Sequence, residues 1–160
     1  MGSKDRNPKI ATSPPNRQPV IKGDPASFDK LKLRLRLDLL DIDHPKWGWK
    51  RLTKEEHLDF LKFIKDLESQ TWAEIRQASG GKGDGKGTNH HPVELHKLRH
   101  EAKNRICELR WQGIIGDTIF SLRINATTRL YGHRDEGYFR PIWHDPFHSR
   151  NHPDSLYPLS

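Results

Sequence analysis

The sequence has little cysteine, no long apolar run and a low share of apolar residues. Cys107 is the single cysteine of the 160-residue chain, which excludes an internal disulfide framework and predicts a reducing compartment. No apolar run approaches the roughly 20 residues that a membrane span needs. The apolar core of a secretory signal is also missing near the first residue. We therefore expect a cytoplasmic protein with no membrane contact.

Apolar residues make up 32% of the chain. Even when glycine is counted with them, this share stays below the roughly 45–50% that is usual in globular domains. Residues 1–26 explain part of this shortfall, because they contain five prolines and almost no large apolar side chain. Such a segment cannot offset its ordering entropy by burial. We expect a flexible basic arm over 1–26, one α+β domain over 27–150 and a tail over 151–160.

Basic residues outnumber acidic ones, with 28 Lys and Arg against 21 Asp and Glu and a formal net charge of +7. A positive balance favours an anionic partner such as nucleic acid, although it says nothing about the fold.

Periodicity predicts the elements of the domain. Apolar and polar residues alternate without a fault from Lys30 to Leu39, which predicts a half-buried edge strand with a cationic outer face. Thr53 and Glu56 form a capping box, and Thr71 and Glu74 form a second one. Each box predicts the start of a helix.

Residues 79–89 contain five glycines and predict a mobile loop. Gly80 to Lys86 has the glycine spacing of a phosphate-binding loop, but Gly87 replaces the required Ser or Thr and a helix precedes it. We therefore reject a nucleotide-binding loop. Pro92 suits the first turn of a third helix reaching Leu109.

Beyond that helix the period changes to two, and three short strands are predicted over 119–125, 128–133 and 138–144. The resulting fold class is α+β, with an N-terminal strand, two to three helices and a three-stranded antiparallel meander. We expect the helices to pack on one face of this meander.

Alternation in the meander predicts a second, polar face. Ile142 is an exception, because an apolar residue falls on that polar face. The polar face is predicted to gather Arg123, Arg129, Tyr131, His133, Arg140 and His144. A solvated face that is basic by chance is the plainer interpretation of the same residues.

These residue types fit cleavage of RNA without a metal ion. Guanidinium groups bind phosphate, and histidine exchanges protons near neutral pH. We assign the scissile phosphate to Arg129 and Arg123, and the base and acid to His133 and His144 in either order.

The remaining predicted contacts support those groups. Arg140 would assist in phosphate binding, Tyr131 would stack on or orient a nucleotide, and His148 would be an alternative proton donor. His90 and His91 are further candidate RNA contacts. A metal site is an alternative that we judge weaker, because its spacing matches no standard ligand motif. Its ligands would be His144, Asp145, His148 and His152.

Several segments together resemble a group of short bacterial proteins over roughly residues 28–150. That group shares NHH, LFSLRL, RLWG and WxDPxH elements. The matching segments are Asn89-His90-His91, Phe120 to Ile124, Arg129 to Gly132 and Trp143 to His148. The resemblance implies no known activity.

In its layout of helices before an antiparallel meander, the chain is also similar to messenger RNA endonuclease toxins of the RelE type, within the barnase, EndoU, colicin and RelE group. This resemblance implies RNA cleavage without a metal or other cofactor, free or on the ribosome, and inhibition by a cognate antitoxin protein. Two alternatives stay open, a non-catalytic nucleic-acid-binding module and a protein-interaction component of a phage or defence system.

Overall fold

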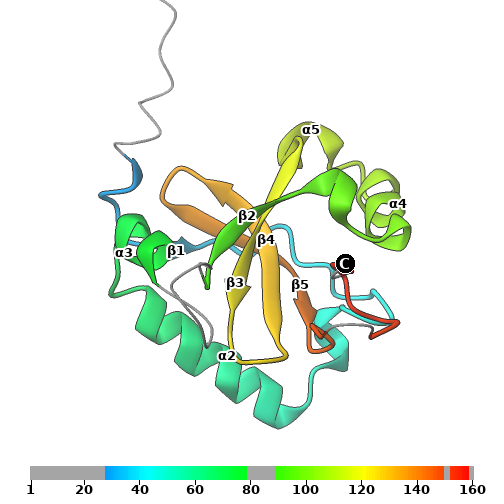
Figure 1. Cartoon of the computed structure of the whole chain (residues 1–160), viewed down its shortest axis with the longest axis horizontal. Coiled ribbons are helices and arrows are strands. Elements are labelled where there is room, and N and C mark those ends of the chain that lie inside the picture. Colours follow the sequence, from blue (N-terminus) through cyan, green and yellow to red (C-terminus); the bar gives the residue numbers. More distant parts are fainter. Residues whose placement is uncertain (1–27, 79–88, 150–151, 159–160) are drawn as a thin grey trace, which may run out of the picture.

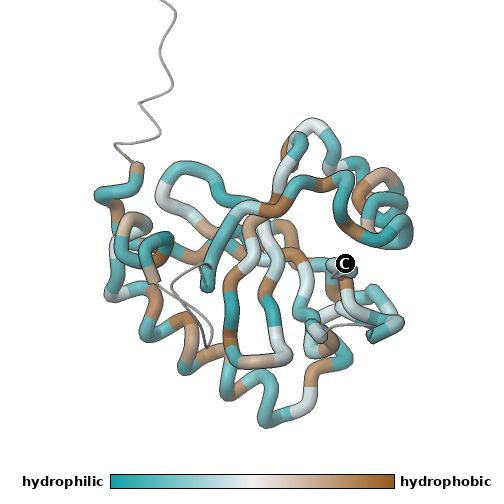
Figure 2. The backbone as a smooth tube through the Cα atoms, viewed as in Figure 1, coloured by the Kyte–Doolittle hydropathy of each residue, from teal (hydrophilic) through white to brown (hydrophobic). Residues whose placement is uncertain are grey.

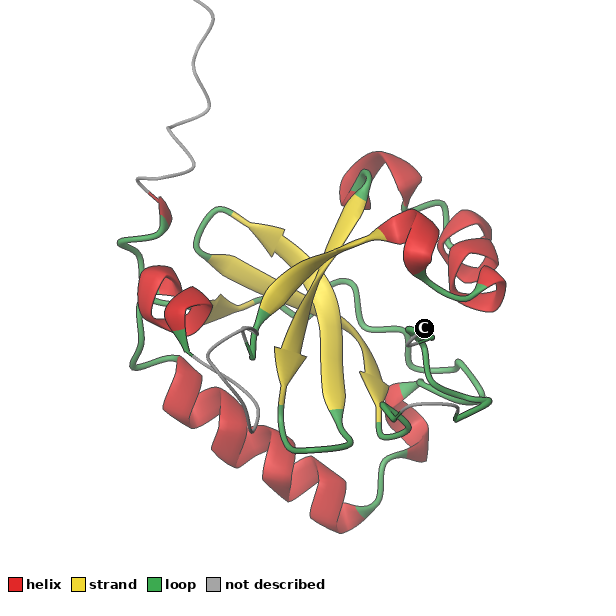
Figure 3. Ribbon diagram, in the orientation of Figure 1, coloured by secondary structure: helices red, strands yellow, loops and turns green. Residues whose placement is uncertain are grey.

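A five-stranded mixed sheet forms the centre of the computed structural model, which describes residues 28–78, 89–149 and 152–158 (Figures 1 and 3). The strands are β1 (Arg34–Leu35), β2 (His91–Glu94), β3 (Thr118–Arg123), β4 (Arg129–Asp135) and β5 (Tyr138–Asp145). Their order is β1-β5-β4-β3-β2, with β1 parallel to β5 and every other pair antiparallel. The α+β class is confirmed. The predicted basic arm and nearly all of the glycine-rich loop lie outside the described residues.

The predicted meander is confirmed as β3, β4 and β5. Asn125 closes the β3–β4 turn, because its Oδ1 accepts the backbone N–H groups of Thr127 and Thr128 at 3.0 and 2.9 Å. Glu136 closes the β4–β5 turn with a φ of 55°. Both turns could be predicted from the sequence, since an Asx turn and a left-handed residue each depend on only a few neighbouring residues.

The sheet is larger than the predicted three strands, because β1 and β2 extend its two edges. The alternating segment from Lys30 to Leu39 contributes only the two residues of β1 to the ladder. Leu33 is buried, whereas Leu37 is 53% exposed. The chain turns away at Leu37, whose carbonyl accepts the N–H of Leu40 at 3.4 Å, so the long predicted strand is wrong in length but right in its edge position.

Both predicted capping boxes are present. Thr53 Oγ1 accepts the N–H of Glu56 at 3.1 Å, and Glu56 Oε2 accepts the N–H of Thr53 at 2.8 Å. This box starts α2 (Lys54–Leu67), and the box of Thr71 starts α3 (Trp72–Gln77). Each box satisfies two backbone N–H groups that the first helical turn leaves without partners.

The predicted start of the third helix is wrong. Pro92 lies in β2, and α4 (His100–Glu108) begins eight residues later, followed by α5 (Gln112–Ile115). A short 3₁₀ turn, η2 (Leu95–Lys97), separates β2 from α4. Proline is tolerated in β2 because this strand is at the edge of the sheet.

Helices cover both faces of the sheet, which corrects the prediction of helices on one face. On one side, Phe60 of α2 and Trp72 of α3 pack with Leu130. On the other side, Ile106 of α4 packs with Tyr131. Figure 2 shows apolar and polar residues alternating along the central strands and around α2. Among the described residues, no helix is long and apolar enough to cross a membrane.

Candidate active site

A bulge in β5 decides which side chains share a face of the sheet. Tyr131 of β4 pairs with Trp143, but the next residue, Gly132, pairs with Pro141. Ile142 is therefore the extra residue, and the side-chain alternation of β5 inverts across it. Phe139 packs on the α2 side, whereas Trp143 packs on the α4 side.

The inversion separates the residues that alternation had placed together. His144 pairs with Leu130 and lies on the α2 side, where its Nδ1 is 3.3 Å from Arg51 Nη2. It is 1% exposed, and burial lowers its pKa to about 4. The predicted pairing of His144 with Arg129 on one open face is therefore wrong.

Arg140 and His133 lie at the other end of the meander. Arg140 donates to both carboxylate oxygens of Asp38, at 3.0 and 2.8 Å, in a bidentate ion pair, and it pairs with His133 in the β4–β5 register. His133 is four residues along β4 from Arg129, a separation of about 13 Å at about 3.3 Å per residue. Neither side chain lies with the arginines of the β3–β4 turn.

Five of the six remaining predicted residues come together on the α4 side, and His90 is the exception. Arg123 and Arg129 pair across β3 and β4, and Tyr131 follows two residues along β4. His91 enters the same face through its pairing with Ser121, which in turn pairs with Tyr131. We call this set the arginine–histidine cluster, and its members are Arg123, Arg129, Tyr131, His91 and His148.

His148 reaches the cluster from the segment after β5. Its backbone N–H donates to the carbonyl of Thr127 in the β3–β4 turn at 2.8 Å. Asp145 fixes this segment, because its two carboxylate oxygens accept the N–H groups of Phe147 and Leu156 at 2.8 and 2.9 Å. Asp145 is fully buried, and burial raises its pKa to about 6.

The two arginines have no carboxylate partner among the described residues. Arg129 Nη1 donates to the carbonyls of Asn125 and Thr128 at 2.8 and 3.1 Å, and Arg123 Nη1 donates to Asn89 Oδ1 at 3.3 Å. Burial and the charge of Arg123 lower the pKa of Arg129. Two neighbouring guanidinium groups without a carboxylate are suited to binding an anion.

Both histidines of the cluster are held neutral. Burial and the charge of Arg129 lower the pKa of His91. Burial, followed by the charges of Arg129, His91 and Arg123, lowers the pKa of His148 to about 4. A neutral imidazole has a free nitrogen lone pair, which is what a general base requires.

Three side-chain atoms of the cluster are buried without a hydrogen-bond partner among the described residues. They are His91 Nδ1, His148 Nδ1 and the hydroxyl of Tyr131. Ser121 is near enough to affect the pKa of Tyr131, but the two hydroxyls do not meet hydrogen-bond geometry. Native proteins rarely leave such atoms unsatisfied, and functional sites are where the exceptions occur.

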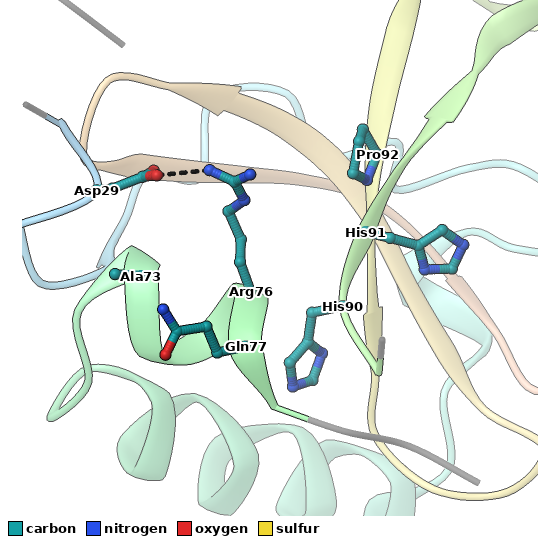
Figure 4. A pocket seen from close by; sticks show the side chains of 7 residues that line it. All are labelled: Asp29, Ala73, Arg76, Gln77, His90, His91 and Pro92. Carbon is teal, nitrogen blue, oxygen red and sulfur yellow. Dashed lines mark hydrogen bonds and ion pairs between the residues drawn. The ribbon is translucent and has the colours of Figure 1, made fainter. Parts of the chain in front are cut away.

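Tyr131 and His90 have roles that differ from those predicted. Tyr131 is fully buried, so it has no open ring face on which a base could stack. His90 Nδ1 accepts the N–H of Arg123 at 3.1 Å, and its ring lies 6.1 Å from that of Phe63. Figure 4 shows the side chains of His90, the residue before β2, and of His91, the first residue of β2, pointing to opposite sides. His90 therefore anchors the backbone of β3 from the α2 side.

The alternative metal site does not assemble. Of its four proposed ligands, His144 lies on the α2 side, Asp145 is engaged with two backbone amides, and His152 stacks on Phe147 with ring centroids 4.7 Å apart. In the described part of the chain, no three His, Cys, Asp or Glu side chains are grouped so as to hold a metal ion.

Sequence reasoning named His148 but missed Tyr157, which lies farther along the segment after β5. Tyr157 borders the cluster, because its phenol acts on the pKa of Tyr131, and the Asp145 carboxylate ties this segment down. The segment has no periodic pattern, so its position could not be predicted from the residues alone. No family model, curated protein or solved structure matches this chain.

Proposed function

We propose that the protein is an RNA endonuclease that works without a metal ion, in the manner of RelE-type toxins. One observation carries the proposal. Arg123 and Arg129 adjoin two neutral histidines and a tyrosine; within the described part of the chain the arginines lack carboxylate partners and the buried polar atoms of the other three side chains are unpartnered. Arginine suits a phosphate, and a pair of imidazoles suits the two proton transfers of RNA cleavage.

The exposed fraction of each side chain indicates its role in the proposed site. Arg129 is only 8% exposed, so it supplies positive potential from beneath the site. Arg123, His91 and His148 keep partial exposure and contact the scissile phosphate. Because Tyr131 is buried, its hydroxyl lies beneath the site and does not touch RNA, and burial raises its pKa so that it stays protonated.

In the proposed reaction, one histidine accepts the proton of the ribose 2′-hydroxyl while the 2′-oxygen attacks phosphorus. The bond from phosphorus to the 5′-oxygen breaks, and the other histidine gives its proton to that oxygen. The products are a 2′,3′-cyclic phosphate and a 5′-hydroxyl end. Both histidines are neutral in the free protein, but a bound phosphate is a neighbouring negative charge that raises imidazole pKa values. Substrate binding therefore supplies the protonated acid, and the arginines stabilise the charge of the pentavalent phosphorane.

The test is cleavage of labelled single-stranded RNA by the purified protein in EDTA, with and without ribosomes. We expect cyclic phosphate and 5′-hydroxyl ends. We also expect His148→Ala and Arg123→Ala to lower the rate by about 100-fold or more, as for loss of a general acid or base. His100→Ala and Arg34→Ala are matched controls, because both side chains are exposed outside the cluster.

Unchanged cleavage by His148→Ala and Arg123→Ala would refute this site. Salt-dependent RNA binding without any cleavage would instead support the non-catalytic binding module, which uses the same two arginines. The resemblance to RelE-type toxins also implies a regulatory partner. We propose that a cognate antitoxin protein holds this protein inactive.

A further inference from the structure

A groove adjoins the cluster on the side of β2. It has a volume of about 390 Å³ and is lined by His91, Pro92, Val93, Glu94, Lys97, Thr118 and Tyr157. His91 belongs to both the groove and the cluster, so the two are continuous at this residue. Tyr157 links the two electrostatically as well, since its phenol acts on the pKa values of Tyr131 and Lys97.

The residues that line the groove offer both apolar surface and charged groups. Pro92 and the half-buried Tyr157 offer apolar surface, which suits the faces of a nucleobase. At the rim, Lys97 Nζ lies 2.8 Å from Glu94 Oε2, which places one hydrogen-bond donor beside one acceptor. His96 Nε2 lies 3.5 Å from the same oxygen. Glu94 is 53% exposed at its side chain, so its other carboxylate oxygen, Oε1, is available to a ligand.

The position of Glu94 is fixed by the fold. It ends β2 opposite Thr118, and the 3₁₀ turn η2 that follows returns Lys97 to the carboxylate at i+3. This acceptor is the one negatively charged group among the described residues that line the groove, in a protein of net charge +7. A carboxylate repels the phosphates of a nucleic acid, so a carboxylate beside an RNA path is suited to reading a base instead.

We propose that this groove holds the nucleotide next to the scissile phosphate and that Glu94 selects a base with an exocyclic amino group. The amino group of cytosine donates to a carboxylate, and the neighbouring ring nitrogen accepts from Lys97. Uracil presents a carbonyl oxygen in place of that amino group, and two oxygen acceptors repel each other. The inference rests on the proposed function for the identity of the ligand as RNA.

The test is equilibrium binding of 2′-O-methyl oligocytidylate and 2′-O-methyl oligouridylate, measured by fluorescence anisotropy with the full chain. The methyl group blocks cleavage, so affinity is read even from an active enzyme. We expect the protein to bind the cytidylate about tenfold more tightly, as one good base contact provides. In Glu94→Gln the side chain gains a donor that accommodates uracil, and we expect the two affinities to differ by less than about twofold.

Glu108→Gln is the matched control, because Glu108 is an exposed carboxylate paired with Arg105 on α4 and lies outside the groove. It is expected to keep the tenfold preference. Equal affinities in the unmodified protein, a preference that survives Glu94→Gln, or no binding of either oligonucleotide would overturn the inference. Failure of the proposed function is separate, since it shows as intact unmodified RNA in the presence of a normal cytosine preference.

Discussion

Buried neutral histidines are expected to make the fold sensitive to mild acid. His90 is 7% exposed and His144 is 1% exposed, and burial lowers the pKa of each to about 4 from a value of 6.5. Between these values the unfolded chain binds more protons than the folded one. The free energy of unfolding therefore falls as pH falls through this interval, and the loss is complete below about pH 4.

The magnitude follows from about 1.4 kcal/mol for each unit of pKa difference. At pH 5, each of the two histidines costs about 2 kcal/mol relative to pH 8. Asp145 acts in the opposite direction, because its pKa is raised to about 6 from 3.8, so protonation between these values favours the folded state. Its contribution at pH 5 is about 1 kcal/mol of stabilisation, which leaves a net loss of about 3 kcal/mol from these three groups. His148, whose pKa is also lowered to about 4, adds to this loss in the same direction.

The assay is urea unfolding followed by tryptophan fluorescence at several values between pH 8 and pH 5. His144→Asn keeps an acceptor for Arg51 but does not titrate, so we expect its loss of stability over this interval to be about 2 kcal/mol smaller. Each variant is compared with its own value at pH 8, which removes any constant cost of the substitution. His96→Asn is the control, because the His96 side chain is 75% exposed. An equal pH dependence in His144→Asn and the unmodified protein would refute the reasoning.

Three further predictions concern the sheet, its tail and the phosphate contact. Gly132→Ala would place a Cβ 2.5 Å from both a β5 carbonyl oxygen and the ring of Phe139; we expect a loss of about 1–3 kcal/mol by thermal unfolding, and an unchanged Tm would contradict this packing. In Asp145→Asn, the new side-chain NH2 group faces one of the two backbone N–H groups that the carboxylate binds, so two hydrogen-bond donors oppose each other. We expect about 2 kcal/mol lower stability and slower RNA cleavage, whereas wild-type values for both would show that the tail does not need this carboxylate. Arg123→Gln should weaken RNA binding and reduce the slope of log affinity against log salt by about 1, and an unaltered slope would remove Arg123 from the phosphate site.

Local signals were enough to predict several elements of the fold. A capping box needs only four consecutive residues, so Thr53 and Thr71 identify the starts of two helices without any tertiary information. The meander was equally accessible, since period-two alternation and its turn residues lie within about 30 residues of one another. The composition of the cluster was predicted in part, because Arg123 and Arg129 stand opposite each other across a short hairpin.

The failures have physical causes that act over longer distances. Pro92 is compatible with the first turn of a helix and equally with an edge strand, and only the pairing of β2 with β3 decides between the two. The Leu-rich segment of 30–39 keeps perfect alternation, yet its pairing with β5 ends after two residues. Ile142 broke the predicted face pattern in the sequence, and the structure shows the reason as a bulge.

By itself, the sequence determined the starts of α2 and α3, the three meander strands, the basic charge and the presence of arginines on the meander, because each depends on neighbours along the chain. Only the tertiary structure decided which histidines meet those arginines. The bulge at Ile142 sends His144 to the α2 side, while strand pairing brings in His91 and a bond to the β3–β4 turn brings in His148. A one-residue change of register inverts every side chain beyond it, and periodicity alone contains no information about where that change occurs.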